Sequence, residues 1–296
     1  MNQAIRLFDQ DLVLAHRRRA LRRAVNGADF LLRAAVDDLA DRLAAVKRHF
    51  AVAVDLATPL PLLAERLLVS DQVGALFRFD PLGGGAIRGD LEALPFRDGS
   101  LDLVVSSLAL HWVNDLPGVL AQIRRALKPD GLFLANFLGG ETLHELRESL
   151  TAAEADVTGG ASPRVAPFAE LRDLGALLQR AGFALPVIDQ DRLTVRYANA
   201  IDLMRDLRAM GAANALHERS HRPLRREVLF RAAALYAERF SDPDGRIRAS
   251  FDIVSLSGWA PDESQQKPLR PGSAKARLAD ALGTTETSSG EKAGGS

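Results

Sequence analysis

The chain has 296 residues, of which 47% are hydrophobic and 26% are charged, and it contains no cysteine. This length accommodates one large domain or a domain with an appended region. The absence of cysteine excludes disulfide bonds, thiolate zinc sites, cysteine-held iron–sulfur clusters and a cysteine nucleophile. The 38 basic and 38 acidic residues cancel, so the overall charge does not favour nucleic acid or an anionic membrane as a partner.

No apolar run approaches the roughly 20 residues that a membrane-spanning helix needs. Residues 1–23 include Asp9 and Asp11 and lack a continuous apolar core, so they do not match a secretory signal. We therefore expect a protein without a membrane span, located in the cytoplasm.

The N-terminal region, residues 1–50, has apolar residues among many charges at a spacing that predicts helices. Within it, the run His16-Arg17-Arg18-Arg19 could bind an anion. A basic run on an amphipathic helix more often forms a solvated face, and we favour that interpretation.

The first strand is predicted at residues 51–56, followed by a helix at 62–68 and a second strand at 73–79. A parallel strand pair needs a crossover of roughly a dozen residues. The gap from Asp80 to Ala86 is shorter than that. Either the usual crossover helix has been lost here, or residues 73–79 are irregular.

The stretch from 89 to 138 carries the clearest pattern. Residues 101–110 are almost unbroken aliphatic, which is typical of a parallel strand covered on both faces. Residues 116–127 have apolar side chains at helical spacing, and Pro129-Asp130-Gly131 is predicted to end that helix before a strand at 132–138. This succession predicts the central half of an open α/β sheet.

Beyond residue 139 the pattern predicts further helices and strands around that sheet. Helices are expected at 142–156, 168–181, 200–210 and 225–240, an antiparallel pair of edge strands at 184–189 and 192–197, and a strand at 251–259.

Several short motifs stand between these elements in a recognisable order. They are Asp55 after the first strand, Gly89-Asp90 before Leu94-Pro95-Phe96, the run 100–106, and Leu127-Lys128-Pro129-Asp130-Gly131. Together they resemble the class I S-adenosylmethionine (SAM) dependent methyltransferase superfamily. That resemblance implies an open, mostly parallel Rossmann-like sheet.

A closer likeness rests on scattered residues that extend from about 8 to 280. They include the segments 110–118, 139–143, 210–214 and 271–274, together with Gly258-Trp259. These segments resemble the group of mitochondrial complex I assembly factors that act as arginine hydroxylases, with their bacterial relatives. The likeness implies a SAM-linked enzyme whose substrate is a protein, specifically an arginine on a respiratory complex I subunit. The methyltransferase that esterifies malonyl carrier protein is a more distant likeness.

The superfamily resemblance also implies a set of cofactor-binding residues beyond the carboxyl ends of the strands. By position these are Asp55, Ala57, Asp80, Asp90, Leu91, Ser107 and Leu108. Asp55 would be the acid of the first turn, Asp80 the ribose acid and Asp90 the adenine contact. The alternatives are a helix cap for Asp55 and turn positions for Asp80 and Asp90.

The turn after the first strand departs from the family pattern of acid, Leu and three alternating glycines. This chain has Asp55-Leu56-Ala57-Thr58-Pro59-Leu60-Pro61, so all three glycine positions are replaced. Proline has no amide hydrogen to donate, and glycine normally permits a close approach of the ligand. We therefore expect SAM to bind weakly, if it is the cofactor.

His111 and Trp112 follow the strand end beside the expected ligand crevice, and with Asn214 they are the candidate substrate contacts. The alternative for His111 and Trp112 is packing, in which the indole closes the sheet edge. No set of His and carboxylate residues has the spacing of a metal site. The sequence identifies no catalytic residue.

We divide the chain into an N-terminal helical segment (1–50), a methyltransferase-like domain (51–198), a C-terminal helix-and-strand lid (199–283) and a disordered tail (284–296). Three functions remain open: an enzyme that modifies a protein arginine, a non-catalytic assembly protein on a degenerate methyltransferase fold, and a carrier-protein carboxyl methyltransferase. The last would use Arg222, Arg225 and Arg226 to meet an acidic partner.

Overall fold

A computed structural model describes residues 6–168 and 171–265 of the chain. The chain divides into one unit over Met1–Pro261 and a second over Asp262–Ser296. Only residues 262–265 of the second unit are described. The expected tail at 284–296 and residues 266–283 of the expected lid, which include the segment 271–274, therefore lie outside the described residues, and the domain boundaries stay predictions.

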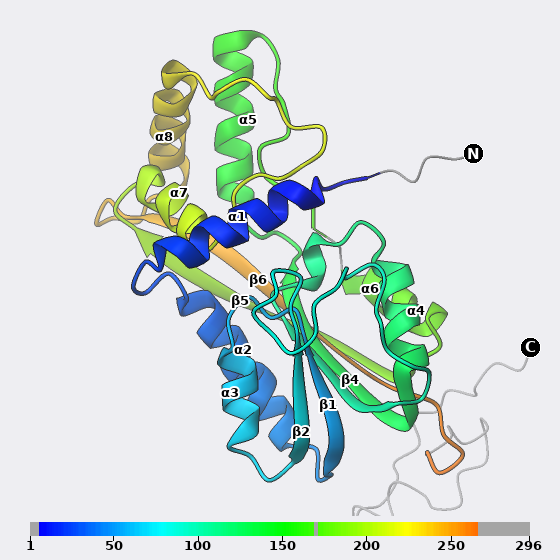
Figure 1. Cartoon of the computed structure of the whole chain (residues 1–296). Coiled ribbons are helices and arrows are strands. Elements are labelled where there is room, and N and C mark those ends of the chain that lie inside the picture. The colour runs from blue at the N-terminus through cyan, green and yellow to red at the C-terminus, as the bar shows by residue number, and fades with distance from the viewer. Residues whose placement is uncertain (1–5, 169–170, 266–296) are drawn as a thin grey trace, which may run out of the picture. The chain divides into compact units, whose positions relative to one another are not determined.

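One six-stranded sheet forms the centre of the described part of the first unit, with the strand order β2-β1-β3-β4-β6-β5 (Figure 1). The strands are β1 (Phe50–Leu56), β2 (Val73–Phe79), β3 (Leu101–Ser107), β4 (Leu127–Gly139), β5 (Ala184–Tyr197) and β6 (Ile247–Trp259). The first four strands are parallel to one another, and β6 is antiparallel to both β4 and β5. This confirms the predicted open, mostly parallel α/β sheet.

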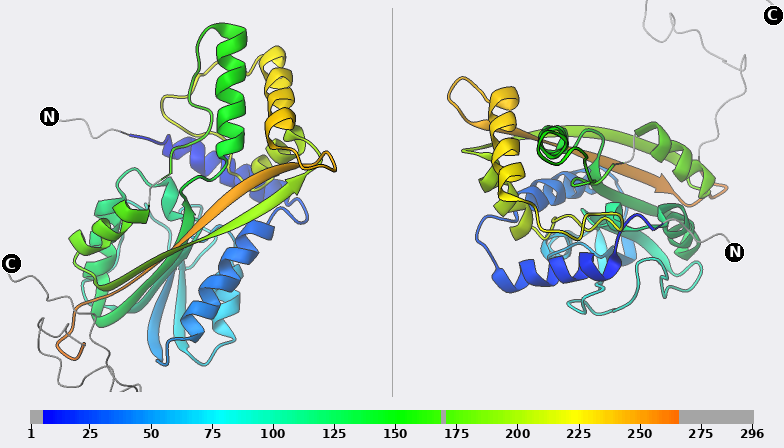
Figure 2. Two further views of the ribbon diagram at one scale, coloured as in Figure 1. Left: turned by 180° about the vertical axis from the view of Figure 1, so that it is seen from behind. Right: turned by 90° about the horizontal axis from the view of Figure 1, so that it is seen from above.

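Helices cover both faces of this sheet. They are α1 (Gln10–Arg23), α2 (Phe30–Ala44), α3 (Leu62–Leu68), α4 (Leu116–Ala126), α5 (His144–Thr158), α6 (Leu171–Arg180), α7 (Ala200–Ala209) and α8 (Arg226–Phe240), with a 3-10 turn η1 (Leu110–Trp112). One apolar core contains residues of α2, α3, α5, α7 and α8, and the other contains residues of α4 and α6. Figure 2 shows α5 and α8 standing side by side beyond the strands.

The alternation of side chains along the central strands produces these two cores. Leu103 and Val105 of β3 belong to the first core, whereas Val104 between them belongs to the second. All three are at most 1% exposed. Burying such a side chain stabilises the fold by about 1.5–3 kcal/mol, so the strand needs apolar residues on both faces.

The short connection after β2 contains no crossover helix. Ile87 forms a parallel bridge with Phe79, and its amide donates to the Arg78 carbonyl at 3.0 Å. The sequence had left open whether the helix was lost or the strand irregular. The strand is regular, so the first alternative holds.

Two strand predictions were wrong in extent. The expected edge pair at 184–189 and 192–197 is one strand, β5, which pairs with β6 over its length. Gln190 and Asp191 lack the glycine or asparagine turn that a two-residue hairpin requires, so the strand continues through them. Pro129-Asp130-Gly131 lies within β4, because α4 already ends at Ala126.

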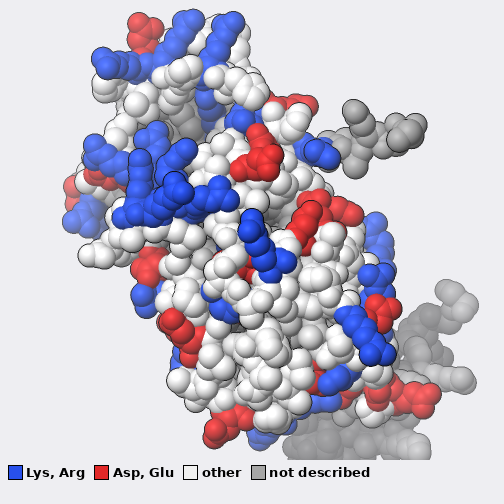
Figure 3. All heavy atoms as spheres, viewed as in Figure 1, with Lys and Arg blue, Asp and Glu red and all other residues white. Residues whose placement is uncertain are grey.

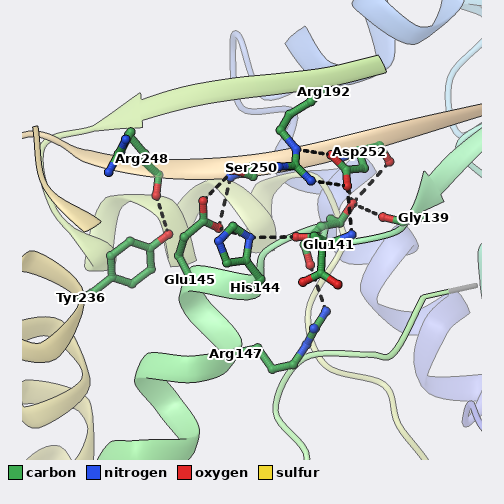
Figure 4. A network of polar contacts seen from close by, with 11 residues as sticks. Gly139, Glu141, His144, Glu145, Arg147, Arg192, Tyr236, Arg248, Ser250 and Asp252 are labelled. Carbon is green, nitrogen blue, oxygen red and sulfur yellow. Dashed lines mark hydrogen bonds and ion pairs between the residues drawn. The ribbon is translucent and has the colours of Figure 1, made fainter. Parts of the chain in front are cut away.

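A polar network joins the end of β4 and the start of α5 to strands β5 and β6 (Figure 4). Asp252 of β6 is fully buried and accepts hydrogen bonds from Arg192 Nε at 2.6 Å, Arg192 Nη2 at 2.8 Å and the Glu141 amide at 2.9 Å. Burial opposes ionisation of this carboxyl, but the bonds from Arg192 and Glu141 outweigh it and lower the pKa of Asp252. Nearby, Glu145 of α5 accepts from Ser250 Oγ at 2.6 Å.

We expect Asp252→Asn to lower the free energy of unfolding at neutral pH by about 2–3 kcal/mol, because the amide cannot replace the charged bonds to Arg192. A lowered pKa means that the wild-type carboxylate contributes its stability above its unfolded pKa of about 3.9 and loses it as pH falls further. The unfolding free energies of the two proteins in urea should therefore converge once the pH falls below the lowered pKa of Asp252.

The matched control is Asp71→Asn, which changes an exposed aspartate in the turn before β2. It should leave the unfolding curve unchanged. An equal loss in both variants would contradict a specific role for the Asp252 network.

Candidate functional site

A cavity of about 410 Å³ lies where α1 and the start of α2 meet the carboxyl edge of the parallel strands. In an open parallel sheet this edge is where ligands bind. Its sheet side is formed by Pro59, Leu60, Leu108, His111, Trp112 and Leu138. One further wall is formed by side chains between residues 17 and 33, from α1, its connection to α2 and the start of α2. Another is formed by residues 209–212, at the end of α7 and just beyond it.

Arg17 connects α1 to this edge. Its side chain is buried, and its Nη2 atom donates to the Ala57 carbonyl at 3.0 Å. Burial lowers the pKa of its guanidinium group, and the charges of Asp80 and Asp55 act in the opposite direction. The basic run that the sequence predicted as a solvated face is therefore split, since Arg17 turns inward while Arg18 and Arg19 are exposed.

Asp55 is the next-to-last residue of β1, and its carboxyl group is fully buried. Its Oδ2 atom lies 3.4 Å from Nε of Arg78, while no described residue bonds its Oδ1 atom. Burial raises the pKa of Asp55 to about 6, although Thr58 and Arg78 act in the opposite direction.

Arg78 of β2 also reaches the turn after β1. Its Nη2 and Nη1 atoms donate to the carbonyls of Thr58 and Gly84, both at 3.1 Å. Arg78 and Arg17 thus bind three groups at the edge where a cofactor would be expected: the Asp55 carboxylate and the carbonyls of Ala57 and Thr58.

Ala57 stands at the first of the replaced glycine positions and has a φ of 62°. This is the left-handed region, which costs an ordinary residue roughly 1–2 kcal/mol. Its amide donates to the Phe79 carbonyl at 2.8 Å. The turn therefore keeps a glycine-like conformation without a glycine.

Asp80 and Asp90 bind their own turns in this structure. Asp80 is buried, and its two oxygens accept from the amides of Leu82 at 2.9 Å and Gly84 at 3.0 Å. Asp90 is exposed and accepts from the Glu92 amide at 2.9 Å. The half-buried Leu91 beside it packs against the second apolar core. None of the three lines the cavity.

Ser107 and Leu108 lie at the end of β3, but only Leu108 lines the cavity. Ser107 is buried, its amide donates to Thr58 Oγ1 at 3.1 Å, and its hydroxyl donates to Asn136 Oδ1 at 2.7 Å. Leu108 has a φ of 47°, and its amide donates to the Asn136 carbonyl at 2.9 Å. These bonds tie the turns after β1 and β3 to β4.

His111 and Trp112 both line the cavity, and their role as substrate contacts stays a prediction. The Trp112 ring also packs against Phe8 and His111, with both centroid distances 5.2 Å. The Nδ1 atom of His111 is shielded from water without a hydrogen-bond partner among the described residues. Burial and the charge of Arg17 lower the pKa of His111 to about 3, so its imidazole is neutral at physiological pH.

Asn214 lies away from the cavity. Its side-chain amide donates to the Pro163 carbonyl at 2.9 Å, and its Oδ1 atom accepts from the Leu216 amide at 3.0 Å. A substrate contact by Asn214 stays a prediction, and in this structure its bonds order a turn.

Sequence reasoning missed the two arginines that bind the first turn. For Arg17, a signal was present, since it lies four residues after the buried Val13 on the same face of α1. For Arg78 no comparable signal exists, because its role depends on the shortened connection after β2.

Among residues 6–168 and 171–265, no group of three or more His, Cys, Asp or Glu side chains could hold a metal ion. Within the same residues, no helix is long and apolar enough to cross a membrane.

Comparison with known proteins places this architecture in a family. A family model described as a methyltransferase domain matches residues 37–135. The mitochondrial arginine hydroxylase NDUFAF5 of Mus musculus is 37% identical over 98% of this chain and 88% of that protein. The chain belongs to this methyltransferase-related family. The Homo sapiens member is 38% identical over 92% of this chain and 82% of that protein.

More distant matches agree with that placement. The malonyl-[acyl-carrier protein] O-methyltransferase of Xylella fastidiosa is 39% identical over 59% of this chain and 57% of that protein. Among solved structures, a candidate methyltransferase from Bacillus halodurans has a TM-score of 0.51 and 17% identity over 77% of this chain and 99% of that chain. At this identity the likeness shows the fold alone.

The raised pKa of Asp55 leads to a pH-dependent prediction. Relative to Asp55→Asn, the wild type should lose stability as pH rises from about 4 to above 6, because the folded protein resists deprotonation of a group that ionises freely when unfolded. The change should reach roughly 2–3 kcal/mol at 1.36 kcal/mol for each pKa unit. Urea titrations across this range measure it.

The test compares the slope of the free energy of unfolding against pH. Loss of the bond to Arg78 lowers this free energy for the variant at every pH without changing the slope. Parallel curves for the two proteins would show that Asp55 ionises normally.

Proposed function

We propose that the protein is an enzyme of the SAM methyltransferase family that modifies an arginine side chain of a protein substrate during assembly of respiratory complex I. The family relationship over nearly the whole chain supports this proposal. The observation that carries it is the cavity at the carboxyl edge of the sheet, with His111 in its wall. The substrate contacts His111 and Trp112 are part of the proposal.

The chemistry of the cavity suits a long side chain with a polar end. Its walls are mostly apolar and can cover the methylene stem of an arginine. A neutral His111 can accept a hydrogen bond through Nδ1 without repelling a guanidinium group. Asp29, also in the wall, supplies a carboxylate, which at present pairs with Arg33 at 2.6 Å.

The residues present do not fit SAM in the way the family pattern implies. Both oxygens of Asp80 accept from turn amides, Asp90 faces solvent, and Pro59 and Pro61 have no amide to donate. SAM binding by Asp55, Ala57 and the other predicted residues stays a proposal. Hydroxylation would insert an oxygen atom, and we assign no oxygen-activating residue.

The direct test is mass spectrometry of complex I subunits from a strain that lacks the gene. We expect an arginine that carries an added oxygen or methyl group in the wild type to be unmodified in the deletion strain. Complementation with His111→Gln should reduce the modification by about tenfold or more, as for loss of a hydrogen bond to a charged group.

The matched control is His217→Gln, an exposed histidine outside the cavity wall, which should restore modification fully. An arginine pattern that does not change on deletion would overturn the proposal. If His111→Gln and His217→Gln restored arginine modification equally, His111 would not be a substrate contact, but the enzyme assignment would stand.

A non-catalytic assembly protein is the second candidate, and the contacts of Arg17 and Arg78 favour it. Arg78 already pairs with Asp55, and the two arginines donate to the carbonyls of Ala57 and Thr58. Under this candidate, calorimetric titration with SAM at concentrations on the order of millimolar gives no heat and no thermal stabilisation. Binding that Asp55→Asn abolishes in a folded variant would instead support a cofactor-dependent enzyme.

Carrier-protein methylation and a cytoplasmic location have less support than the two functions above. Methyl transfer to a carrier-protein carboxylate draws on the match to the Xylella fastidiosa enzyme, and Arg222, Arg225 and Arg226 are exposed. The cytoplasmic location stays a prediction, and the names of the vertebrate relatives place those proteins in mitochondria.

A further inference from the structure

Helix α1 presents two chemically different sides. Arg17, Ala20, Leu21 and Ala24 line the cavity. Residues three and four apart share a side of a helix, so Arg18, Arg19, Arg22 and Arg23 fall on the other side. We call these four residues the α1 arginine face, and all four are exposed.

The α1 arginine face has no acidic partner within the described part of the chain. Neither an ion pair nor a side-chain hydrogen bond is formed there by any of the four, whereas Arg42 and Arg192 each bind carboxylates. Figure 3 shows basic side chains gathered over α1 and α7. Helix α7 carries the exposed Arg205 and Arg208, of which Arg205 pairs with Asp202. This concentration occurs on a chain whose net charge is zero.

The internal structure explains only part of this concentration. Arg22 and Arg23 lie in the last turn of α1, where cations interact favourably with the helix dipole. Arg18 and Arg19 lie a turn earlier and gain little from it. The pairs Arg18 with Arg22 and Arg19 with Arg23 are four residues apart, so their like charges repel. Within the described part of the chain, contacts inside the protein therefore do not account for four arginines on the solvent side of α1. A partner outside the protein would account for them.

We propose that the α1 arginine face binds an acidic segment of the substrate protein, so that the residue to be modified lies at the adjoining cavity. The identification of the partner as the substrate rests on the proposed function, whereas the binding itself does not. Exposed apolar side chains border the same helix, with Leu21 at 43% and Val25 at 50% exposure, and both belong to the cavity wall. Arginines beside apolar residues are typical of protein interfaces.

Two other anionic partners fit less well. Nucleic acid is generally bound by chains or domains with a strong positive balance, and this chain has none. A helix that lies on a membrane turns its apolar side to the lipid. The corresponding side of α1 faces the cavity and carries the buried Arg17.

The test measures binding of a fluorescein-labelled poly-glutamate peptide to the full chain by fluorescence anisotropy at low ionic strength. The variant combines Arg18→Gln, Arg19→Gln, Arg22→Gln and Arg23→Gln. The matched control combines Arg97→Gln, Arg172→Gln, Arg180→Gln and Arg239→Gln, which removes the same charge from exposed positions in the loop before β3, on α6 and on α8. A third protein replaces the four α1 arginines by lysine.

We expect the α1 variant to bind the peptide at least about tenfold more weakly, since each exposed ion pair contributes modestly and four act together. The control and the lysine variant should bind within about threefold of the wild type, and wild-type binding should weaken with salt. Circular dichroism establishes that each variant is folded.

Several outcomes would overturn the inference: no binding by the wild type, equal losses in the α1 variant and the control, or α1-dependent binding that is tighter for oligothymidylate or for phosphatidylglycerol vesicles than for the peptide. The assay involves no cofactor and no turnover. Its failure alongside intact arginine modification would contradict this inference alone, and the reverse pattern would contradict the proposed function alone.

Discussion

Burial of the central parallel strands on both faces is the constraint from which the rest of the structure follows. With helices on each side, β1, β3 and β4 meet water only at their ends, so polar groups at those ends must find partners there. Ser107 and Asn136 illustrate this, because they are fully buried and their hydrogen bonds join the turn after β1, the end of β3 and α2. The carboxyl edge is thus a polar layer fixed between two apolar cores, and the cavity opens on that layer.

The hydrogen bonds of the turn after β1 differ from those of a ligand-binding glycine loop. A loop of that kind offers backbone amides to a ligand. Here Arg17 and Arg78 approach the turn from a helix and from the neighbouring strand, and both donate to its carbonyls. The chain thereby satisfies internally the groups that a bound molecule would otherwise contact. At the cavity wall, Nδ1 of the neutral His111 has no hydrogen-bond partner among the described residues.

The sequence was sufficient to predict the sheet because periodicity and burial are properties of consecutive residues. The strand predicted at 101–110 corresponds to β3, which ends earlier at Ser107, and the helix predicted from residue 116 begins at Leu116. The path of β5 was not, since its continuity depends on pairing with β6, which is distant in sequence. The same limit applies at the site. His111 was singled out from its position after a strand and Leu108 from the family resemblance, whereas the inward turn of Arg17 and the reach of Arg78 depend on tertiary neighbours. Asp80 and Asp90 show the converse, because a family pattern marks a position without specifying which bonds the side chain makes.

The conformation of Ala57 shows that the shape of a turn can persist after the residue that usually permits it has gone. Its left-handed backbone is held by the bond from its amide to Phe79 and by the contact of its carbonyl with Arg17. Neighbouring strands and a helix therefore impose the dihedral angles that glycine would adopt freely. A search of proteins for this kind of site by glycine spacing would pass over such a chain, whereas a search by backbone dihedral angles at the ends of first strands would retrieve it.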